Sequence, residues 1–287
     1  MGYYVDRKSS LCKPRLREVL QLSPTSAVDL GLANLLDIGG RVAVITGGAQ
    51  GIGAGIAERF AEAGATVFIA DLDADNAAKT AAEICQRHEG RAHGIALDVT
   101  QADSIAAVLD EVLSQTGRLD IWVNNAGIYP SAPILEQTTE EWRTVLEINL
   151  DSVFVASREA ARRMVALGNG GVIINIASVA GLKTRVGGSA HYNVSKAGVA
   201  MLTKVLALEL GPEQIRVMAI APGLVATPGV LQHEVYREYF DILREMLPLR
   251  RTLVPDDIAR VALFLASDMA SAMTGCVLPV ESGELLT

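Results

Sequence analysis

The sequence predicts an α/β fold: a doubly wound parallel sheet of about seven strands with helices on both faces, in a single domain. Short runs rich in Val and Ile alternate along the chain with longer helical periods rich in Ala, Leu and Glu. Runs that are apolar throughout are typical of strands buried on both faces, and this alternation is typical of βαβ units with right-handed crossovers. A closed barrel would need eight such units. The sequence contains no short internal repeat, which argues against a solenoid.

The elements follow one another in a regular order. We predict strands at residues 42–45, 66–70, 121–123, 172–176, 217–221 and 277–280, with one more directly before Asp98. We predict helices at residues 52–63, 73–88, 104–116, 140–166 and 195–210. Residues 223–255 break the alternation and are too long for a tight connection, so we expect a substrate-binding loop there. We expect substrate specificity to lie in this loop and in residues 179–188. Its apolar residues favour a lid: Val230, Tyr236, Tyr239, Phe240, Leu243, Met246 and Leu247.

Composition excludes several classes of protein. Half of the residues are apolar, which is incompatible with a disordered chain, and no apolar run reaches the roughly 18 residues of a membrane span. The 25 Lys and Arg against 33 Asp and Glu give a net charge of −8, which argues against a nucleic-acid partner. Cys12, Cys85 and Cys276 form no C-x-x-C pair, and the histidines lack metal-ligand spacing. We therefore expect no disulfide framework, no metal site and a reducing, cytoplasmic setting.

A glycine-rich turn joins the first predicted strand to the first helix. Gly47, Gly51 and Gly53 would let the backbone turn tightly and approach a pyrophosphate, which the N–H groups of the helix N-terminus would bind. The spacing differs from G-x-G-x-x-G, and glycine also serves ordinary strand–helix packing. This motif alone leaves both interpretations open.

An acidic residue ends the second predicted strand. Asp71 at this place would accept hydrogen bonds from the ribose hydroxyls of an adenosine and would repel a 2′-phosphate. The alternative is that Asp71 caps the next helix, but Asp73 stands nearer to the helical period and is the better cap. Since Gln50 and Leu72 bring no positive charge, NAD is favoured over NADP.

Further polar residues follow the later strands. They are Asp98-Val99, Asn124 to Gly127, Asn149, Ser178, and Tyr192 with Lys196. The carboxyl ends of parallel strands converge on one crevice, so these side chains can meet there. Tyr192 and Lys196 are four residues apart and share a helical face.

Residues 46–53, 124–127, Ser178, 192–196 and Pro222-Gly223 together resemble the short-chain dehydrogenase/reductase family, in its compact single-domain branch with a Rossmann fold. The resemblance covers about residues 38–283. Residues 38–287 would thus be the dinucleotide-binding and catalytic domain, and residues 1–37 an N-terminal extension. The chain departs from the family at Glu281-Ser282-Gly283, where Asp-Gly-Gly is usual.

The resemblance implies a catalytic set of Asn149, Ser178, Tyr192 and Lys196. Tyr192 would be the acid/base, and Lys196 would lower the pKa of its hydroxyl and bind the nicotinamide ribose. Ser178 would hydrogen-bond the substrate oxygen, and Asn149 would hold a water that relays protons. The implied cofactor-binding residues are Gly47, Gln50, Gly51, Ile52, Gly53, Asp71, Leu72, Asp98, Val99, Asn125, Ala126, Gly127, Tyr192, Lys196, Pro222, Gly223, Val225 and Thr227. We expect His191 at the pocket rim, outside the catalytic set, and Asn124 in a structural role.

The sequence thus predicts an oxidoreductase that transfers a hydride between NAD(H) and a secondary alcohol or ketone. One alternative is an NADPH-dependent reductase of the 3-oxoacyl carrier-protein type, against which Asp71 speaks. The other is a non-catalytic dinucleotide-binding redox sensor, which is disfavoured because Tyr192 and Lys196 are both present.

Two predicted helices also carry more apolar residues than one buried stripe needs, and in the resembled family they pair across a two-fold axis. We therefore expect a homotetramer. The residues concerned are Val153, Val155, Val199, Met201, Val205 and Leu206.

Overall fold

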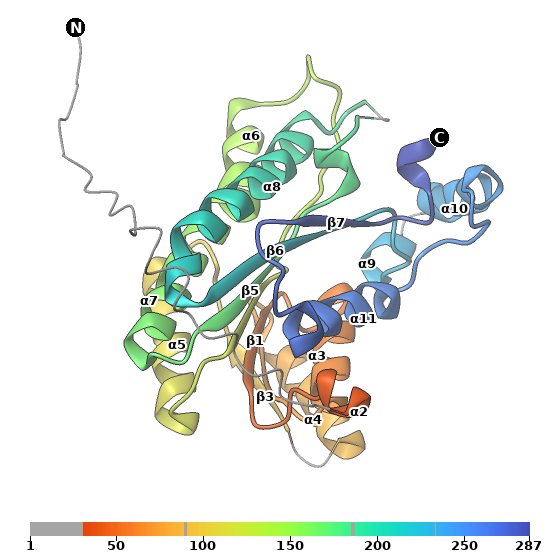
Figure 1. Cartoon of the computed structure of the whole chain (residues 1–287). Helices are drawn as coiled ribbons and strands as arrows, with labels where there is room; N and C mark the ends of the chain where they lie inside the picture. Colours follow the sequence, from red (N-terminus) through yellow and green to blue (C-terminus); the bar gives the residue numbers. More distant parts are fainter. Residues whose placement is uncertain (1–30, 89–90, 185–186, 233) are drawn as a thin grey trace, which may run out of the picture. The chain divides into compact units, whose positions relative to one another are not determined.

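Seven parallel strands form one sheet in the order β3-β2-β1-β4-β5-β6-β7 (Figure 1). The structure, a computed structural model, describes residues 31–88, 91–184, 187–232 and 234–287. The strands are β1 (Val42–Thr46), β2 (Thr66–Asp71), β3 (Ala92–Ala96), β4 (Ile121–Asn124), β5 (Gly171–Ile176), β6 (Ile215–Pro222) and β7 (Val277–Val280). The predicted doubly wound sheet is confirmed, including the strand expected before Asp98.

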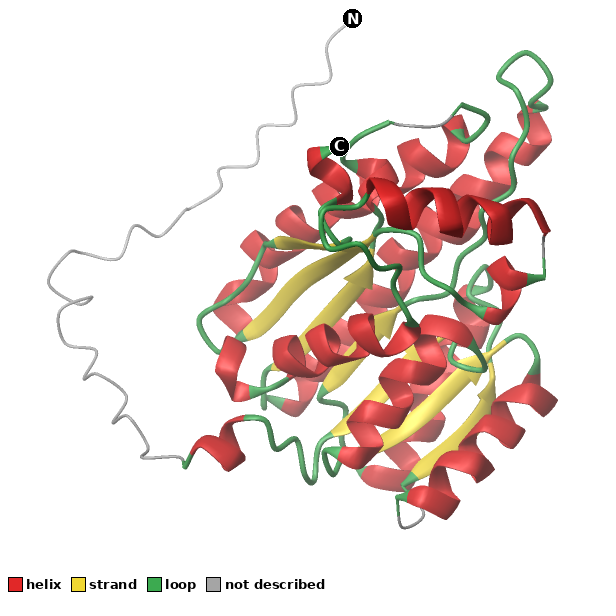
Figure 2. Cartoon of the chain, turned by 90° about the vertical axis from the view of Figure 1, so that its right-hand side faces the viewer, coloured by secondary structure: helices red, strands yellow, loops and turns green. Residues whose placement is uncertain are grey.

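Helices cover both faces of this sheet (Figure 2). They are α2 (Leu32–Leu35), α3 (Gly51–Glu62), α4 (Ala74–Arg87), α5 (Ala102–Thr116), α6 (Thr139–Leu146), α7 (Ser152–Leu167), α8 (Ala190–Leu210), α9 (Pro228–Leu231), α10 (Glu234–Met246) and α11 (Pro255–Ala266). The buried apolar side chains of α3, α4 and α11 belong to one cluster, and those of α5 and, apart from Val153, of α7 belong to a second. Leu35–Thr287 is one compact unit. Most of the predicted extension, residues 1–37, lies outside the described residues.

Strand β1 shows why the strand sequences are apolar throughout. Ala43 and Ile45 pack into the first cluster, whereas Val42 and Val44 pack into the second. Successive side chains of a strand point to opposite faces, and here each face is covered by helices. The one polar side chain of this strand, Thr46, stands at its carboxyl end, where its hydroxyl donates to the main-chain oxygen of Val123.

The strand order reverses beside β1. Strand β1 pairs with β2 on one side and with β4 on the other: the chain runs outward from β1 through β2 to β3, then crosses back to β4 and continues in the opposite direction. The loops that leave the carboxyl ends of β1 and β4 therefore diverge and open a crevice, which is where doubly wound sheets bind ligands.

The helix predicted at residues 140–166 is interrupted. A π-helical turn, Glu147–Asp151, joins α6 to α7, and Asn149 lies inside it, fully buried. Apolar periodicity does not reveal a single wide turn, because the flanking helices keep their spacing. Such turns are frequent at functional sites, where they displace one residue from the helical surface.

Two further predictions of element bounds are corrected. Helix α8 begins at Ala190 rather than at residue 195, so Tyr192 lies in its first turn. The segment 223–255 is not an irregular loop, because it contains α9 and α10. Among the described residues no helix is long and apolar enough to cross a membrane.

Only part of the apolar excess on α7 and α8 faces outward. Val153, Val199 and Leu206 are buried within the chain's own core, so the prediction that these three side chains pack against a second subunit is wrong. Met201 and Val205 are exposed, and Leu208 is exposed as well. On α8 these three share one face, since they are spaced at i, i+4 and i+7.

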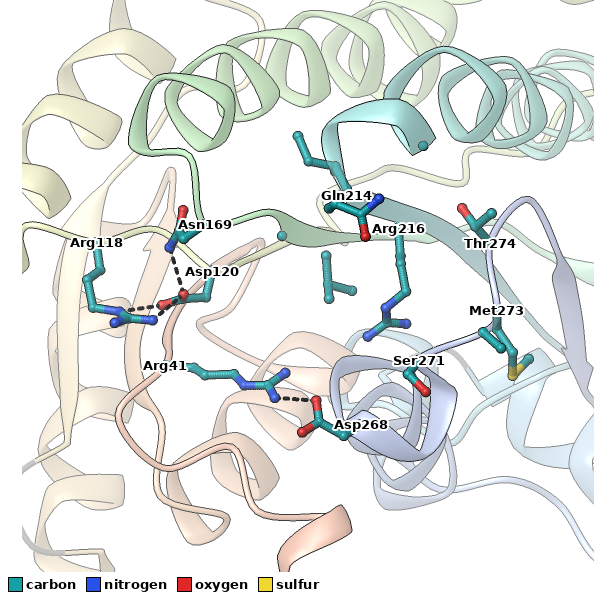
Figure 3. A pocket seen from close by; sticks show the side chains of 15 residues that line it. Arg41, Arg118, Asp120, Asn169, Gln214, Arg216, Asp268, Ser271, Met273 and Thr274 are labelled. Atoms are coloured by element: carbon teal, nitrogen blue, oxygen red, sulfur yellow. Dashed lines mark hydrogen bonds and ion pairs between the residues drawn. The ribbon is translucent and has the colours of Figure 1, made fainter. Parts of the chain in front are cut away.

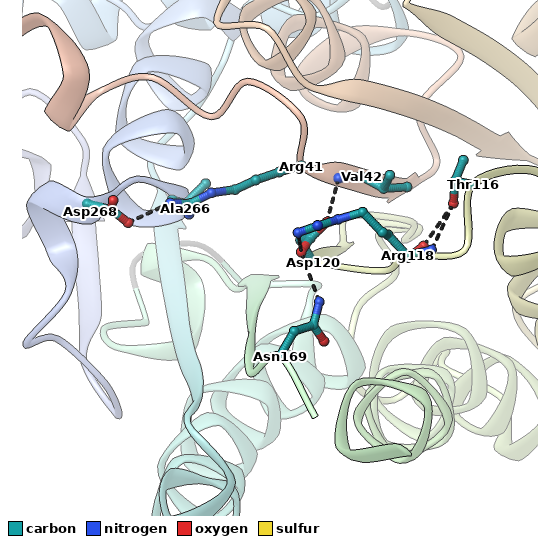
Figure 4. Close-up of polar contacts among 8 residues, drawn as sticks. All are labelled: Arg41, Val42, Thr116, Arg118, Asp120, Asn169, Ala266 and Asp268. Atoms are coloured by element: carbon teal, nitrogen blue, oxygen red, sulfur yellow. Dashed lines mark hydrogen bonds and ion pairs between the residues drawn. The ribbon is translucent and has the colours of Figure 1, made fainter. Parts of the chain in front are cut away.

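Asp120 ties the amino ends of three strands together (Figure 4). Its carboxylate accepts hydrogen bonds from the main-chain N of Val42 at 2.8 Å, from Arg118 at 2.7 Å and from Asn169 Nδ2 at 3.2 Å. These partners flank or begin β1, β4 and β5. The buried carboxylate of Asp120 thus fixes the amino-terminal ends of these strands, at the end of the sheet opposite the crevice.

Candidate active site

A cavity of about 770 Å³ lies along the carboxyl ends of the strands. Its wall contains residues at the ends of β1 to β6 together with the start of α8. Of the residues predicted for the site, all line this cavity except Gly53 and Asn149. The structure therefore brings together residues that are far apart in the sequence.

The glycine-rich turn after β1 has the backbone geometry that the motif predicts. Gly47 and Gly51 have φ angles of +61° and +59°, a region that other residues rarely adopt. A Cβ on Gly53 would stand 2.3 Å from the main-chain oxygen of Gly47, so α3 packs tightly against the turn. Gln50 precedes α3 but makes no side-chain hydrogen bond to its N-terminus. The first N–H groups of α3 are left to a ligand, which fits a pyrophosphate.

Asp71 and Asp73 have separate tasks. Asp73 accepts a hydrogen bond from the main-chain N of Asn76 at 3.0 Å and is the cap of α4. Asp71 lines the cavity, and its oxygens accept hydrogen bonds from the main-chain N of Ala49 at 3.0 Å and of Asp73 at 3.1 Å. Two main-chain donors thus hold the Asp71 carboxylate at the end of β2.

Lys196 is buried one turn after Tyr192 on α8. Its Nζ donates a hydrogen bond of 2.8 Å to the main-chain oxygen of Ile176, at the end of β5. The same atom lies 5.8 Å from the centre of the Tyr192 ring. Burial lowers the pKa of Lys196 to about 8, because a charged amine loses hydration there.

Ser178 stands just beyond the end of β5. Its Oγ accepts a hydrogen bond of 3.1 Å from the main-chain N of Ala180, which caps a short 3₁₀ turn. A hydroxyl that accepts in this way keeps its own hydrogen for donation. Ser178 can therefore donate to an oxygen in the cavity.

Asn149 lies behind the cavity wall. Its Oδ1 accepts from the main-chain N of Ile128 at 2.8 Å, while its Nδ2 donates to the main-chain oxygen of Ile128 at 2.7 Å and to Ser195 Oγ at 3.3 Å. A Cβ on Gly127 would stand 3.0 Å from Asn149 Oδ1 and 3.6 Å from Lys196 Nζ. The side chain of Asn149 thus fixes the strand-exit segment that passes Lys196.

One of the two neighbouring predictions is wrong. His191 is not at the pocket rim: it is 1% exposed, and its Nδ1 accepts a hydrogen bond of 2.8 Å from the main-chain N of Tyr192. This contact satisfies a free donor in the first turn of α8. Asn124 is structural, as predicted. Its Oδ1 accepts a hydrogen bond from Trp122 Nε1, and its Nδ2 donates to Asn175 of β5 and to Ser157 of α7.

The segment 223–255 forms less of the wall than predicted. Of the seven apolar residues proposed as a lid, Val230 lines the cavity. Phe240, Leu243 and Leu247 are buried elsewhere, and Met246 is exposed. The side chains of Tyr236 and Tyr239 lie outside the described residues. An apolar helix face predicts burial but does not say against what.

The sequence pattern did not single out two charged residues of the cavity wall, although Lys183 lies within the predicted specificity segment 179–188. Lys183 follows the Ser178 turn, and Glu284 comes from the C-terminal turn Glu284–Leu286. Neither belongs to a motif. Only the chain path through space brings them to the crevice.

A second cavity, of about 510 Å³, lies at the amino-terminal ends of the strands, opposite the crevice (Figure 3). Arg41 and Arg216 extend into it, but their guanidinium groups donate to the main-chain oxygens of Ala266 and Leu265 at the end of α11. Arg41 also pairs with Asp268. Basic side chains stabilise the carboxyl end of a helix in this way, so these arginines have a structural explanation.

Comparison with known proteins agrees with this geometry. A sequence model described as "Enoyl-(Acyl carrier protein) reductase" matches residues 47–284. In structure the chain is similar to a short-chain type dehydrogenase/reductase from Mycobacterium marinum, with a TM-score of 0.84 and 37% identity over 88% of this chain and 98% of that one. The chain belongs to the short-chain dehydrogenase/reductase family.

Curated relatives within this family are similar over most of their length. The 3-oxoacyl-[acyl-carrier-protein] reductase FabG of Aquifex aeolicus is 37% identical over 246 residues, which is 85% of this chain and 97% of that protein. The D-threitol dehydrogenase of Mycolicibacterium smegmatis is 38% identical over 260 residues, 90% of this chain and 98% of that one. As a short-chain dehydrogenase/reductase, the protein is an oxidoreductase that uses a nicotinamide dinucleotide.

Proposed function

We propose that this protein is an NAD-dependent dehydrogenase that interconverts a secondary alcohol and a ketone. The observation that carries the proposal is that the same cavity is lined by Asp71, the proposed ligand of the adenosine ribose, and by Ser178, Tyr192 and Lys196. The test is hydride transfer between NAD(H) or NADP(H) and a panel of secondary alcohols and ketones. We further propose that the protein works in the cytoplasm.

The cavity offers a place for each part of the dinucleotide. The N–H groups at the start of α3 would bind the pyrophosphate, Asp71 the adenosine ribose, and Asp98 with Val99 the adenine. The strand-exit segments 125–127 and 222–227, which hold Asn125, Ala126, Gly127, Pro222, Gly223, Val225 and Thr227, would flank the nicotinamide half. When bound, the nicotinamide supplies the site that accepts or gives the hydride.

The protein's own residues would handle the proton and the substrate oxygen. Tyr192 takes the hydroxyl proton in the oxidative direction and returns it in the reductive one. The charge of Lys196 favours the phenolate form of Tyr192, since an opposite charge nearby stabilises an anion. Ser178 donates a hydrogen bond to the substrate oxygen. The relay of protons through a water held by Asn149 completes the proposal.

The preference for NAD rests on charge around Asp71. Among the described residues that line the cavity, the basic ones are Lys183 and Lys196. Both are held elsewhere, since Lys196 bonds to Ile176 at the end of β5 and Lys183 to the C-terminal turn. A 2′-phosphate near Asp71 would meet a carboxylate and no cation from this wall, which disfavours NADP.

The second candidate is an NADPH-dependent reductase of the 3-oxoacyl carrier-protein type. The similarity to relatives named as such reductases favours it. It uses the same four residues, so cofactor and substrate preference separate the two proposals. NADPH turnover with a 3-oxoacyl thioester, above that with NADH and a simple ketone, would select the second candidate.

We also propose that the protein assembles as a homotetramer. Val194, Met201, Val205 and Leu208 form an exposed apolar stripe along α8, each spaced by three, four or seven residues from the next. On α7, Phe154 is 44% exposed and packs under Arg158. A helix with a second apolar face is stabilised by a partner, and pairing of identical helices about a two-fold axis would cover both copies.

A further inference from the structure

A chain of buried polar side chains joins β4, β5 and α8 inside the protein. Asn124 Nδ2 donates to Asn175 Oδ1 at 2.8 Å, and Asn175 Nδ2 donates to Thr203 Oγ1 at 2.9 Å. Thr203 Oγ1 in turn donates to the main-chain oxygen of Val199 at 2.8 Å. Asn175 and Thr203 are fully buried, and neither lines the active-site cavity. The proposed chemistry therefore gives these two side chains no direct role.

The bond between Asn175 and Thr203 accompanies the contact that holds Lys196. Thr203 follows Lys196 by seven residues on α8, so the two side chains share one helical face. Their partners are consecutive on β5: the side chain of Asn175 bonds to Thr203. The main-chain oxygen of Ile176 accepts from Lys196 Nζ at 2.8 Å. Two neighbouring residues of β5 thus bond to the same face of α8.

Much of the other contact between α8 and the sheet is apolar. Val199 packs in one cluster with Ala219 and Ala221 of β6. Apolar contacts are non-directional, whereas a hydrogen bond weakens steeply when its atoms leave their geometry, and a buried amide that loses its partner is costly. The bond between Asn175 and Thr203 therefore restricts movement of α8 along β5 more than these apolar contacts do.

The position of α8 along β5 decides where the charge of Lys196 stands. Lys196 Nζ lies 5.8 Å from the centre of the Tyr192 ring and is bonded to the oxygen of Ile176. The ring of Tyr192 belongs to the helix, whereas that oxygen belongs to the strand. A shift of the helix would therefore change the separation of ammonium and phenol or break the bond to the strand. Since the attraction between opposite charges falls with distance, either change would weaken the stabilisation of a phenolate.

We propose that Asn175 and Thr203 are positioning residues: their hydrogen bond fixes the register of α8 on β5 and thereby keeps the ammonium of Lys196 beside the phenol of Tyr192. This inference rests on the proposed dehydrogenase function, in which Tyr192 takes the proton of the alcohol as a phenolate. Without the bond between Asn175 and Thr203, a higher pH is needed to form that phenolate.

The pH dependence of alcohol oxidation tests this role in Thr203→Val, which removes the hydroxyl and keeps the branched shape. The assay uses the cofactor, NAD or NADP, that the wild type turns over. The pH of half-maximal kcat/KM should rise by about one unit, so that kcat/KM at pH 7 falls about tenfold. Above both midpoints the two proteins should agree within about twofold, because the phenol is then ionised in both. The dissociation constant for the reduced cofactor should change by no more than about twofold.

Two further variants separate positioning from packing. Thr203→Ser keeps the hydroxyl and should keep the wild-type pH profile. Ser157→Ala is the matched control, because fully buried Ser157 accepts from Asn124 Nδ2 at 2.9 Å in the same network but belongs to α7. It should lower the temperature of thermal unfolding and leave the pH profile unchanged. If Thr203→Val does not fold, the double variant Asn175→Val/Thr203→Val, which removes both ends of the bond, carries the same expectation.

The remaining outcomes contradict the inference. An unchanged pH profile in Thr203→Val, or a loss of kcat/KM that is equal at every pH, would overturn it and leave the proposed function intact. The same shift in Thr203→Ser or in Ser157→Ala would overturn it as well, because packing alone would then account for the effect. A wild type that oxidises no secondary alcohol with either cofactor would overturn the proposed function and the inference together.

Discussion

The ammonium nitrogen of Lys196 lies 5.8 Å from the centre of the Tyr192 ring, one turn earlier on α8, and donates to the main-chain oxygen of Ile176. The protein keeps this charge in a buried place, where it loses hydration. Burial lowers the pKa of Lys196 to about 8 from the ordinary value of 10.5. A group that destabilises the fold while standing beside the phenol of the proposed acid/base is typical of a functional site.

Lys196→Met should therefore stabilise the cofactor-free protein at pH 7. The expected gain in the free energy of unfolding is about 2 kcal/mol, because removing the buried charge outweighs the lost hydrogen bond to Ile176. Since the folded-state pKa lies below the ordinary value, the unfolded chain binds more protons between about pH 8 and 10.5. Across that window the free energy of unfolding of the wild type should rise relative to that of the variant, by up to about 1.4 kcal/mol per pH unit.

Urea unfolding of both proteins at pH 7, 8, 9 and 10 measures this difference. Below about pH 8 the difference should be constant, and it should shrink as the pH rises further. A difference that does not change between pH 8 and 10 would show that Lys196 is not held charged at a cost in this fold.

Asp71→Ala should weaken NAD(H) and relieve the rejection of NADP(H), because it removes the proposed ribose acceptor and a negative charge. Asp73→Ala is the matched control. It removes the cap of α4, should cost about 1 kcal/mol of stability, and should leave the cofactor preference unchanged. Dissociation constants for NADH and NADPH, with thermal unfolding of each variant, check both. An unchanged NAD/NADP ratio in Asp71→Ala would remove Asp71 from the cofactor site.

Met201→Asp should reduce the mass of the assembly, because it places a charge in the exposed apolar stripe of α8. Met269→Asp is the control, since Met269 is also exposed but lies outside α7 and α8. Light scattering at micromolar concentration reports the mass. A monomeric wild type, or a tetramer that survives Met201→Asp unchanged, would contradict the proposed interface.

Strand and motif positions were predictable because they depend on local chemistry. An apolar run such as the one in β1 is typical of a strand buried on both faces, the glycines at 47 and 51 allow the positive φ of the turn, and the carboxyl ends of parallel strands converge for any sequence. The start of the helical period likewise predicted that Asp73, and not Asp71, caps α4.

The remaining features depend on packing between distant segments. The π-helical turn around Asn149 leaves the apolar spacing of α6 and α7 intact, so periodicity could not reveal it. Val153 and His191 have ordinary surface or core alternatives that only the fold decides. Glu284 reaches the cavity through the path of the tail past Pro248, which no local pattern encodes.

The most direct measurement is the rate of NADH formation from NAD and a secondary alcohol by the wild type and by Tyr192→Phe. This variant removes one hydroxyl and keeps the ring, so the account predicts a loss of kcat of about a thousandfold or more, with the dissociation constant for NADH changed by no more than about twofold. Activity of Tyr192→Phe within about tenfold of the wild type would contradict the assignment of Tyr192 as the acid/base.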